Sequence, residues 1–161
     1  MSFAPAIATY QSTLSQLKKH GFHGESQTRR AFAEMLNTIS TERGLTYVDE
    51  YPVGARGQKR VDGAVRDTYS TLGYWETKDE YNDLQTEIKT KIAAGYPLNN
   101  TIFEDTNQAI LWQNQKEVAR FNLREDAEIS TLLHTFFHHT EEDKEGFDAA
   151  VTTFVDKIPE L

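Results

Sequence analysis

The chain has 161 residues, of which 38% are hydrophobic and 26% are charged, as in a soluble globular protein of one domain. No apolar run approaches the ~20 residues that span a bilayer, the N-terminus does not resemble a secretory signal, and the absence of cysteine excludes disulfides and thiolate zinc sites. We therefore expect a cytoplasmic protein without a membrane segment. The net charge of −8 counts against tight autonomous binding to nucleic acid, because Lys and Arg contacts to phosphate supply most non-specific affinity.

Two amphipathic helices are predicted at the start of the chain. Apolar residues spaced by three and four predict the first over residues 3–19, ending at Gly21, and the second over residues 25–40, followed by Gly44. The pattern then changes to short segments rich in β-branched and aromatic residues. These predicted strands cover residues 45–53, 59–65, 72–78, 100–104, 109–113 and 117–123.

A further helix is predicted between the third and fourth strands. It covers residues 82–94 and is terminated by Gly95 and Pro97. An order of strand, strand, helix, strand implies a mixed sheet with at least one helical crossover. Apolar patterns over residues 129–137 and 147–158 predict two more helices. The fold class is thus α/β, with a central mixed β-sheet flanked by helices.

Asp62 precedes the sequence Glu76-Thr77-Lys78 by fourteen residues, and the two groups fall on adjacent predicted strands. A hairpin would bring these strands together. Because side chains at i and i+2 of a strand point to the same face, Glu76 and Lys78 share one side of the sheet. The pattern predicts two carboxylates and an ammonium in one cleft.

Those residue types suit the hydrolysis of a phosphodiester. The reaction needs a nucleophilic water and a means of neutralising the charge of the transition state. Asp62 and Glu76 offer the hard oxygen ligands that Mg²⁺ prefers. Lys78 can orient the attacking water and hold negative charge on the phosphate. We therefore expect Mg²⁺ as the cofactor, with Mn²⁺ able to substitute.

At these residues the sequence resembles the PD-(D/E)XK nuclease superfamily, and more closely the N-terminal nuclease domain of single-chain ATP-dependent (type ISP) restriction-modification enzymes. The similarity covers most of the chain, including residues 25–29, 61–63, 73–79 and 82–84. It implies a restriction-endonuclease-like fold, with Asp62 and Glu76 as metal ligands, Lys78 as the catalytic lysine and Glu25 as a helix carboxylate near the metal. Val61 replaces the proline of the motif, a residue that contacts no substrate in the family.

The resemblance also implies partners. In such enzymes the nuclease domain is followed by a helicase-like motor, a methyltransferase and a target-recognition domain, and the substrate is double-stranded DNA. Residues 1–161 would then form a single nuclease domain, the N-terminal part of a larger polypeptide, whose other domains hold the DNA. Local positive charge could come from Arg56, Lys59, Arg60 and Arg66.

Several of these residues have an alternative explanation. Glu76 and Lys78 could be an exposed cross-strand charge pair, Asp62 a carboxylate at a turn, and the four basic residues solvated charges. An acid such as Glu25 is favoured in the first turn of any helix by the macrodipole. The alternative function is a nuclease-like module that binds DNA or docks onto a motor without cleaving. Binding of a divalent metal would separate the two, because a module that does not cleave has no reason to bind one.

Overall fold

A computed structural model describes residues 2–22, 26–78 and 83–140 of the chain, together with the backbone of Glu25 at the start of its helix. The helices are α1 (Ala4–Lys19), α2 (Glu25–Glu42), α3 (Leu84–Ala93) and α4 (Asp126–Phe137). The strands are β1 (Thr46–Val53), β2 (Lys59–Arg66), β3 (Thr71–Thr77), β4 (Asn100–Glu104), β5 (Gln108–Gln113) and β6 (Lys116–Asn122). The helix predicted over 147–158 lies outside the described residues.

The six strands form one sheet in their sequence order, β1-β2-β3-β4-β5-β6. Neighbouring strands are antiparallel except β3 and β4, which are parallel and joined through α3. The predicted hairpin of β2 and β3 is confirmed, and α3 provides the predicted helical crossover. The central strand β4 is buried along its whole length, as expected for a strand that is covered on both faces.

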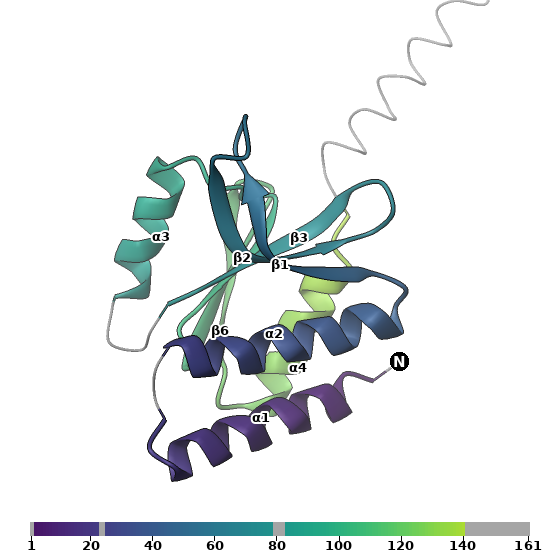
Figure 1. The fold of residues 1–161 in the computed structure, drawn as a ribbon, viewed down its shortest axis with the longest axis vertical. Helices are drawn as coiled ribbons and strands as arrows, with labels where there is room; N and C mark the ends of the chain where they lie inside the picture. The colour runs from purple at the N-terminus through teal and green to yellow at the C-terminus, as the bar shows by residue number, and fades with distance from the viewer. Residues whose placement is uncertain (1, 23–24, 79–82, 141–161) are drawn as a thin grey trace, which may run out of the picture.

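Helices cover the sheet in two separate layers (Figure 1). One face packs against α1, α2 and α4 and carries the larger core, in which Phe32, Trp75 and Phe136 are fully buried. The other face packs against α3 through a smaller cluster of Leu84, Ile88, Leu98, Phe103 and Ile110. The predicted fold class, a mixed sheet flanked by helices, is correct. None of the described helices is both long and apolar enough to span a membrane.

Gly73 lies in β3 at a point where the neighbouring strand β4 and the helix α4 both come very close to its backbone. A Cβ atom at this position would come within 2.5 Å of Phe136 Cε2 and 2.7 Å of the backbone oxygen of Asn100. We expect Gly73→Ala to lower the free energy of unfolding by about 2–4 kcal/mol, because the backbone carbonyl cannot turn aside. Urea denaturation measures the effect. Gly21→Ala is the control: its Cβ would meet nothing within 4 Å, which leaves only the cost of its left-handed φ, about 1 kcal/mol. Equal losses in both variants would contradict the steric explanation.

Candidate active site

The β2–β3 hairpin places Asp62 beside Glu76. Gly63 pairs with Trp75 across the two antiparallel strands, so the next step of the register sets Asp62 against Glu76. Both side chains lie on the α3 face, opposite the Trp75 side chain in the larger core. Asp62 is fixed at the end of the hairpin because its Oδ2 accepts a hydrogen bond from the Thr77 amide at 2.8 Å.

Glu76 is a buried carboxyl group with an incomplete set of partners. The residue is 8% exposed, and its Oε2 receives no hydrogen bond from any described residue. Burial, and after it the hydrogen bond and charge of the neighbouring Asp62 carboxylate, raise the pKa of Glu76 to about 9, against the weaker opposing charges of Lys91 and Lys78. Two carboxyl groups thus share one site that lacks enough positive charge to keep both ionised.

Lys78, the lysine of the motif, lies at the end of β3 and turns toward α3. Its backbone amide donates to the Glu104 carbonyl at 2.8 Å, which continues the parallel pairing with β4. Its Nζ is 3.6 Å from Glu87 Oε2. The ammonium therefore has a direct ion pair with Glu87, although its charge also acts on Glu76.

The cation nearest to Glu76 comes from α3. Lys91 Nζ lies 3.8 Å from Glu76 Oε2 and 3.4 Å from the hydroxyl of Tyr96, and it stands 4.5 Å above the centre of the Tyr96 ring. Burial lowers the pKa of Lys91, but the charge of Glu76 and the contact with Tyr96 outweigh it, so the pKa is raised. Lys91 therefore remains charged beside the acidic pair.

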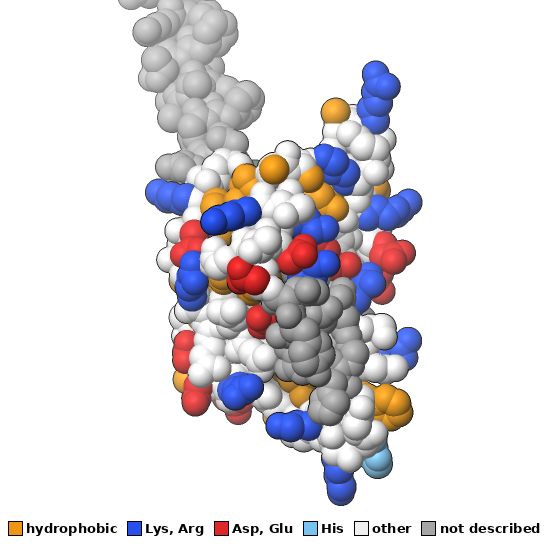
Figure 2. All heavy atoms as spheres, turned by 90° about the vertical axis from the view of Figure 1, so that its left-hand side faces the viewer, with side chains coloured by type: hydrophobic (Ala, Val, Ile, Leu, Met, Phe, Trp, Pro, Cys, Tyr) orange, Lys and Arg blue, Asp and Glu red, His pale blue; other side chains and the backbone are white. Residues whose placement is uncertain are grey.

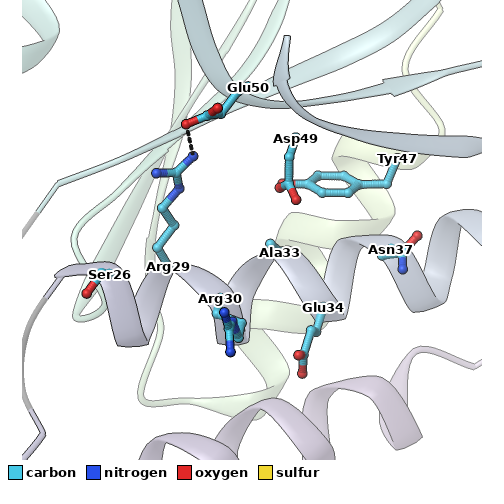
Figure 3. Close-up of a pocket in the computed structure, with 9 residues that line it drawn as sticks. All are labelled: Ser26, Arg29, Arg30, Ala33, Glu34, Asn37, Tyr47, Asp49 and Glu50. Atoms are coloured by element: carbon cyan, nitrogen blue, oxygen red, sulfur yellow. Dashed lines mark ion pairs between the residues drawn. The ribbon is translucent and has the colours of Figure 1, made fainter.

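Asp62 faces a second cation, Arg29 of α2. Arg29 Nη2 is 3.5 Å from Asp62 Oδ1 and 3.6 Å from Glu50 Oε1. Glu50 has a φ of 50°, so β1 departs from regular pairing opposite Asp62. Figure 3 shows Arg29 rising from α2 toward Glu50 across a groove between the helix and β1. The groove has a volume of about 470 Å³, and Tyr47 and Asp49 also line it.

Glu104 is another buried carboxyl group, on the opposite face of the sheet from Glu76. Its Oε1 accepts a hydrogen bond from the indole nitrogen of Trp75 at 3.1 Å, and its Oε2 accepts one from the Thr106 amide at 2.6 Å. Burial raises the pKa of Glu104 to about 7, although its hydrogen bonds from Thr106 and Trp75 oppose the rise. Both carboxylate oxygens of Glu104 accept hydrogen bonds, so its role is structural: it holds the Trp75 indole and the backbone that follows β4.

Three of the four predicted site residues therefore lie together on the α3 face. Asp62 and Glu76 are neighbours across the hairpin, and Lys78 and Glu76 each form an ion pair with a residue of α3. Glu25 is the first residue of α2, as predicted, but its side chain lies outside the described part of the structure. No group of three or more acidic, His or Cys side chains among the described residues could by itself hold a metal ion. The part of Glu25 as a metal ligand stays a prediction.

The residues present fit a divalent cation. Asp62 and Glu76 provide carboxylate oxygens, which hard cations prefer. Glu76 Oε2 is a buried acceptor that receives no hydrogen bond from a described residue, with the Lys91 ammonium 3.8 Å away. A cation there would also oppose the burial and the repulsion by Asp62 that raise the pKa of Glu76.

No family model and no curated protein matches the chain. Among solved structures, the chain is similar to one in the cryo-EM structure of a DrdV–DNA complex, with a TM-score of 0.86 and 34% sequence identity. The similarity covers 97% of this chain and 16% of that chain, so this chain spans a small part of the longer one. The likeness is consistent with a restriction-endonuclease-like fold.

Basic and acidic side chains are mixed on the α3 face of the domain. Figure 2 shows the α3 face, where Lys and Arg side chains stand among Asp and Glu side chains and a basic side chain projects at the end that carries the β1–β2 hairpin. Of the four basic residues singled out in the sequence, Arg60 donates to the Glu50 carbonyl at 2.8 Å, and Arg66 stacks on Tyr51. Arg56 and Lys59, near the hairpin turn, have no such anchor among the residues that the structure describes.

Sequence reasoning missed the charged residues that helices add to this site. Arg29 lies in a segment quoted for the family resemblance, but nothing in its spacing indicated contact with Asp62. Glu87 and Lys91 are four residues apart on α3, a spacing that places both on one helix face. This pair of charges on the helix that follows the motif was the feature of the sequence that could have indicated their contact with the site.

Proposed function

We propose that this domain is a metal-dependent deoxyribonuclease that hydrolyses phosphodiester bonds of double-stranded DNA. The observation that carries the proposal is the pairing of Asp62 with Glu76, whose buried Oε2 accepts no hydrogen bond from a described residue. The similarity to a chain in a DNA complex supports DNA as the substrate. Asp62 and Glu76 would hold Mg²⁺ or Mn²⁺, with Glu25 as a further carboxylate.

When bound, the metal would supply positive charge at the phosphate and lower the pKa of a coordinated water. The chain's own residues do the rest. The Thr77 amide fixes the Asp62 carboxylate, so the site is organised before substrate arrives. The Lys78 ammonium is 28% exposed and would orient the attacking water and stabilise negative charge on the phosphate.

We further propose that the domain works inside an ATP-dependent restriction-modification enzyme, with motor, methyltransferase and target-recognition domains in the same polypeptide or complex. The small share of the DrdV chain that this domain matches supports a longer polypeptide. The net charge of −8 supports delivery to DNA by other domains, since the domain itself would bind DNA weakly.

Cleavage of supercoiled plasmid tests the proposal. We expect the purified domain at low salt to cut with Mg²⁺ or Mn²⁺ and not with EDTA, and Asp62→Ala to lose cutting by about 10³-fold because the metal loses a ligand. Circular dichroism checks that the variant folds. Equal cutting by Asp62→Ala would contradict the assignment of the site. Absence of cutting by the wild type, both alone and joined to its presumed motor, would favour the module that does not cleave.

A further inference from the structure

Helix α3 places one charged side chain beside Glu76 and another beside Lys78, the two charged residues of the motif. Lys91 Nζ lies 3.8 Å from Glu76 Oε2, and Glu87 Oε2 lies 3.6 Å from Lys78 Nζ. Glu87 and Lys91 are one helical turn apart, so a single face of α3 makes both contacts. The nearest positive charge to the buried carboxylate is therefore not the lysine of the motif.

The position of Lys91 is fixed by the way α3 ends. The Gly95 amide donates to the Ile92 carbonyl at 3.0 Å and the Tyr96 amide donates to the Lys91 carbonyl at 3.1 Å, while Gly95 has a φ of 84°. These bonds form a Schellman motif, which folds Tyr96 back over the last turn of the helix. The Tyr96 ring then lies 4.5 Å from the Lys91 ammonium and supports it beside Glu76.

We propose that Lys91 is a positioning residue that makes metal binding at Asp62 and Glu76 dependent on DNA; this inference rests on the proposed function. In the metal-free protein Lys91 supplies the positive charge that Glu76 faces. A divalent cation bound to the same carboxylate would be repelled by the ammonium. Lys91 therefore weakens the binding of metal alone.

A DNA phosphate reverses this effect. Its negative charge attracts both the metal and Lys91, whose side chain is 23% exposed and long enough to move from Glu76 toward a phosphate oxygen. Metal and DNA should then each bind more tightly in the presence of the other, because a coupling between two ligands is reciprocal. The site would take up its metal mainly when DNA is present.

Isothermal titration calorimetry with Mn²⁺ in the absence of DNA tests the inference. We expect Lys91→Met to bind Mn²⁺ about tenfold more tightly than the wild type, because a repelling charge a few ångströms from a divalent ion is removed. Lys91→Arg keeps the charge and should resemble the wild type. Lys89→Met is the matched control, since Lys89 is an exposed lysine on the same helix, and it should also bind as the wild type does. Lys91→Gln repeats the test if Lys91→Met does not fold.

Asp62→Ala separates failure of this inference from failure of the proposed function. If Asp62→Ala loses Mn²⁺ binding while Lys91→Met binds no more tightly than the wild type, the role of Lys91 is wrong and the metal site stands. If Asp62→Ala binds Mn²⁺ as the wild type does, or if the wild type and Lys91→Met both fail to bind, both proposals fall. Binding by Lys91→Met alone would support the inference most strongly.

The coupling itself is measured by the affinity for a short DNA duplex with and without Mn²⁺, in a Lys78→Met background that limits cleavage. We expect Mn²⁺ to tighten duplex binding, and Lys91→Met to reduce that tightening by about tenfold. An unchanged gain would overturn the coupling.

Discussion

Replacing Glu76 by glutamine is expected to abolish DNA cleavage and, without divalent cations, to make the domain more stable. Cleavage should fall by about 10³-fold or more, because the amide is a poor substitute for a carboxylate ligand. Stability should rise because the buried carboxylate beside Asp62 is costly to ionise, and glutamine carries no charge. Plasmid cleavage measures the first effect, and urea denaturation in EDTA measures the second.

The gain in stability should depend on pH with a definite sign. The folded protein raises the pKa of Glu76 from 4.5 to about 9, so the folded state binds its proton more tightly than the unfolded state does. The contribution of Glu76 to the free energy of unfolding is thus complete below pH 4.5 and is lost as the pH rises toward 9. Glu76→Gln lacks this loss. Its advantage over the wild type should therefore grow by about 2–4 kcal/mol between pH 5 and pH 8.

Glu42→Gln is the control for this experiment, because Glu42 is an exposed acid near the end of α2. It should leave both cleavage and the pH dependence of stability unchanged. A Glu76→Gln variant that is less stable than the wild type at pH 8 would show that the Glu76 carboxylate is well compensated without a metal. Added Mg²⁺ should stabilise the wild type and not Glu76→Gln, since a ligand that binds only the folded state raises its stability.

Lys78→Met is expected to lower cleavage by about 10²–10³-fold while leaving metal binding in place, because in the proposed function the ammonium would act on water and phosphate and would not be a metal ligand. Stability should change by less than about 1 kcal/mol, since the ion pair of Lys78 with Glu87 is partly exposed. Cleavage assays and Mn²⁺ calorimetry on the same preparation separate chemistry from metal binding.

Lys89→Met again serves as the control, because it removes the same charge from an exposed position on α3. It should cut as the wild type does. If Lys78→Met cuts at the wild-type rate, the motif lysine has no part in the reaction. Loss of Mn²⁺ binding in Lys78→Met would instead indicate that Lys78 organises the carboxylates.

The strands of this fold could be predicted because each has a local cause in the sequence. Residues 59–66 alternate and are followed by a turn in which Asp67 Oδ1 accepts hydrogen bonds from the Tyr69 and Ser70 amides, so the hairpin that joins Asp62 to Glu76 is specified within about twenty residues. The crossover followed from the helical pattern between β3 and β4. Local periodicity therefore sufficed for the strands and for the hairpin that carries the acidic pair.

The surrounding charges could not be predicted in the same way. The contacts of Lys91 with Glu76 and of Arg29 with Asp62 depend on how α3 and α2 pack on opposite faces of the sheet, and on where long flexible side chains end. The ion pair of Lys78 with Glu87 was also unforeseen, because strand alternation fixes the face of a side chain and not its partner. Such contacts are properties of the tertiary structure.

The hydrogen bond from the Trp75 indole to Glu104 gives the domain a built-in optical reporter. Trp75 is fully buried and stacks on Phe32 with an interplanar angle of 9°, so its emission depends on a fixed surrounding rather than on solvent. The indole precedes Glu76 directly in β3, and its nitrogen touches a carboxylate whose charge alters the local field. With Trp112, the other tryptophan of the chain, replaced by phenylalanine, the intrinsic fluorescence of Trp75 can therefore report on the ionisation of Glu104 in the unlabelled protein.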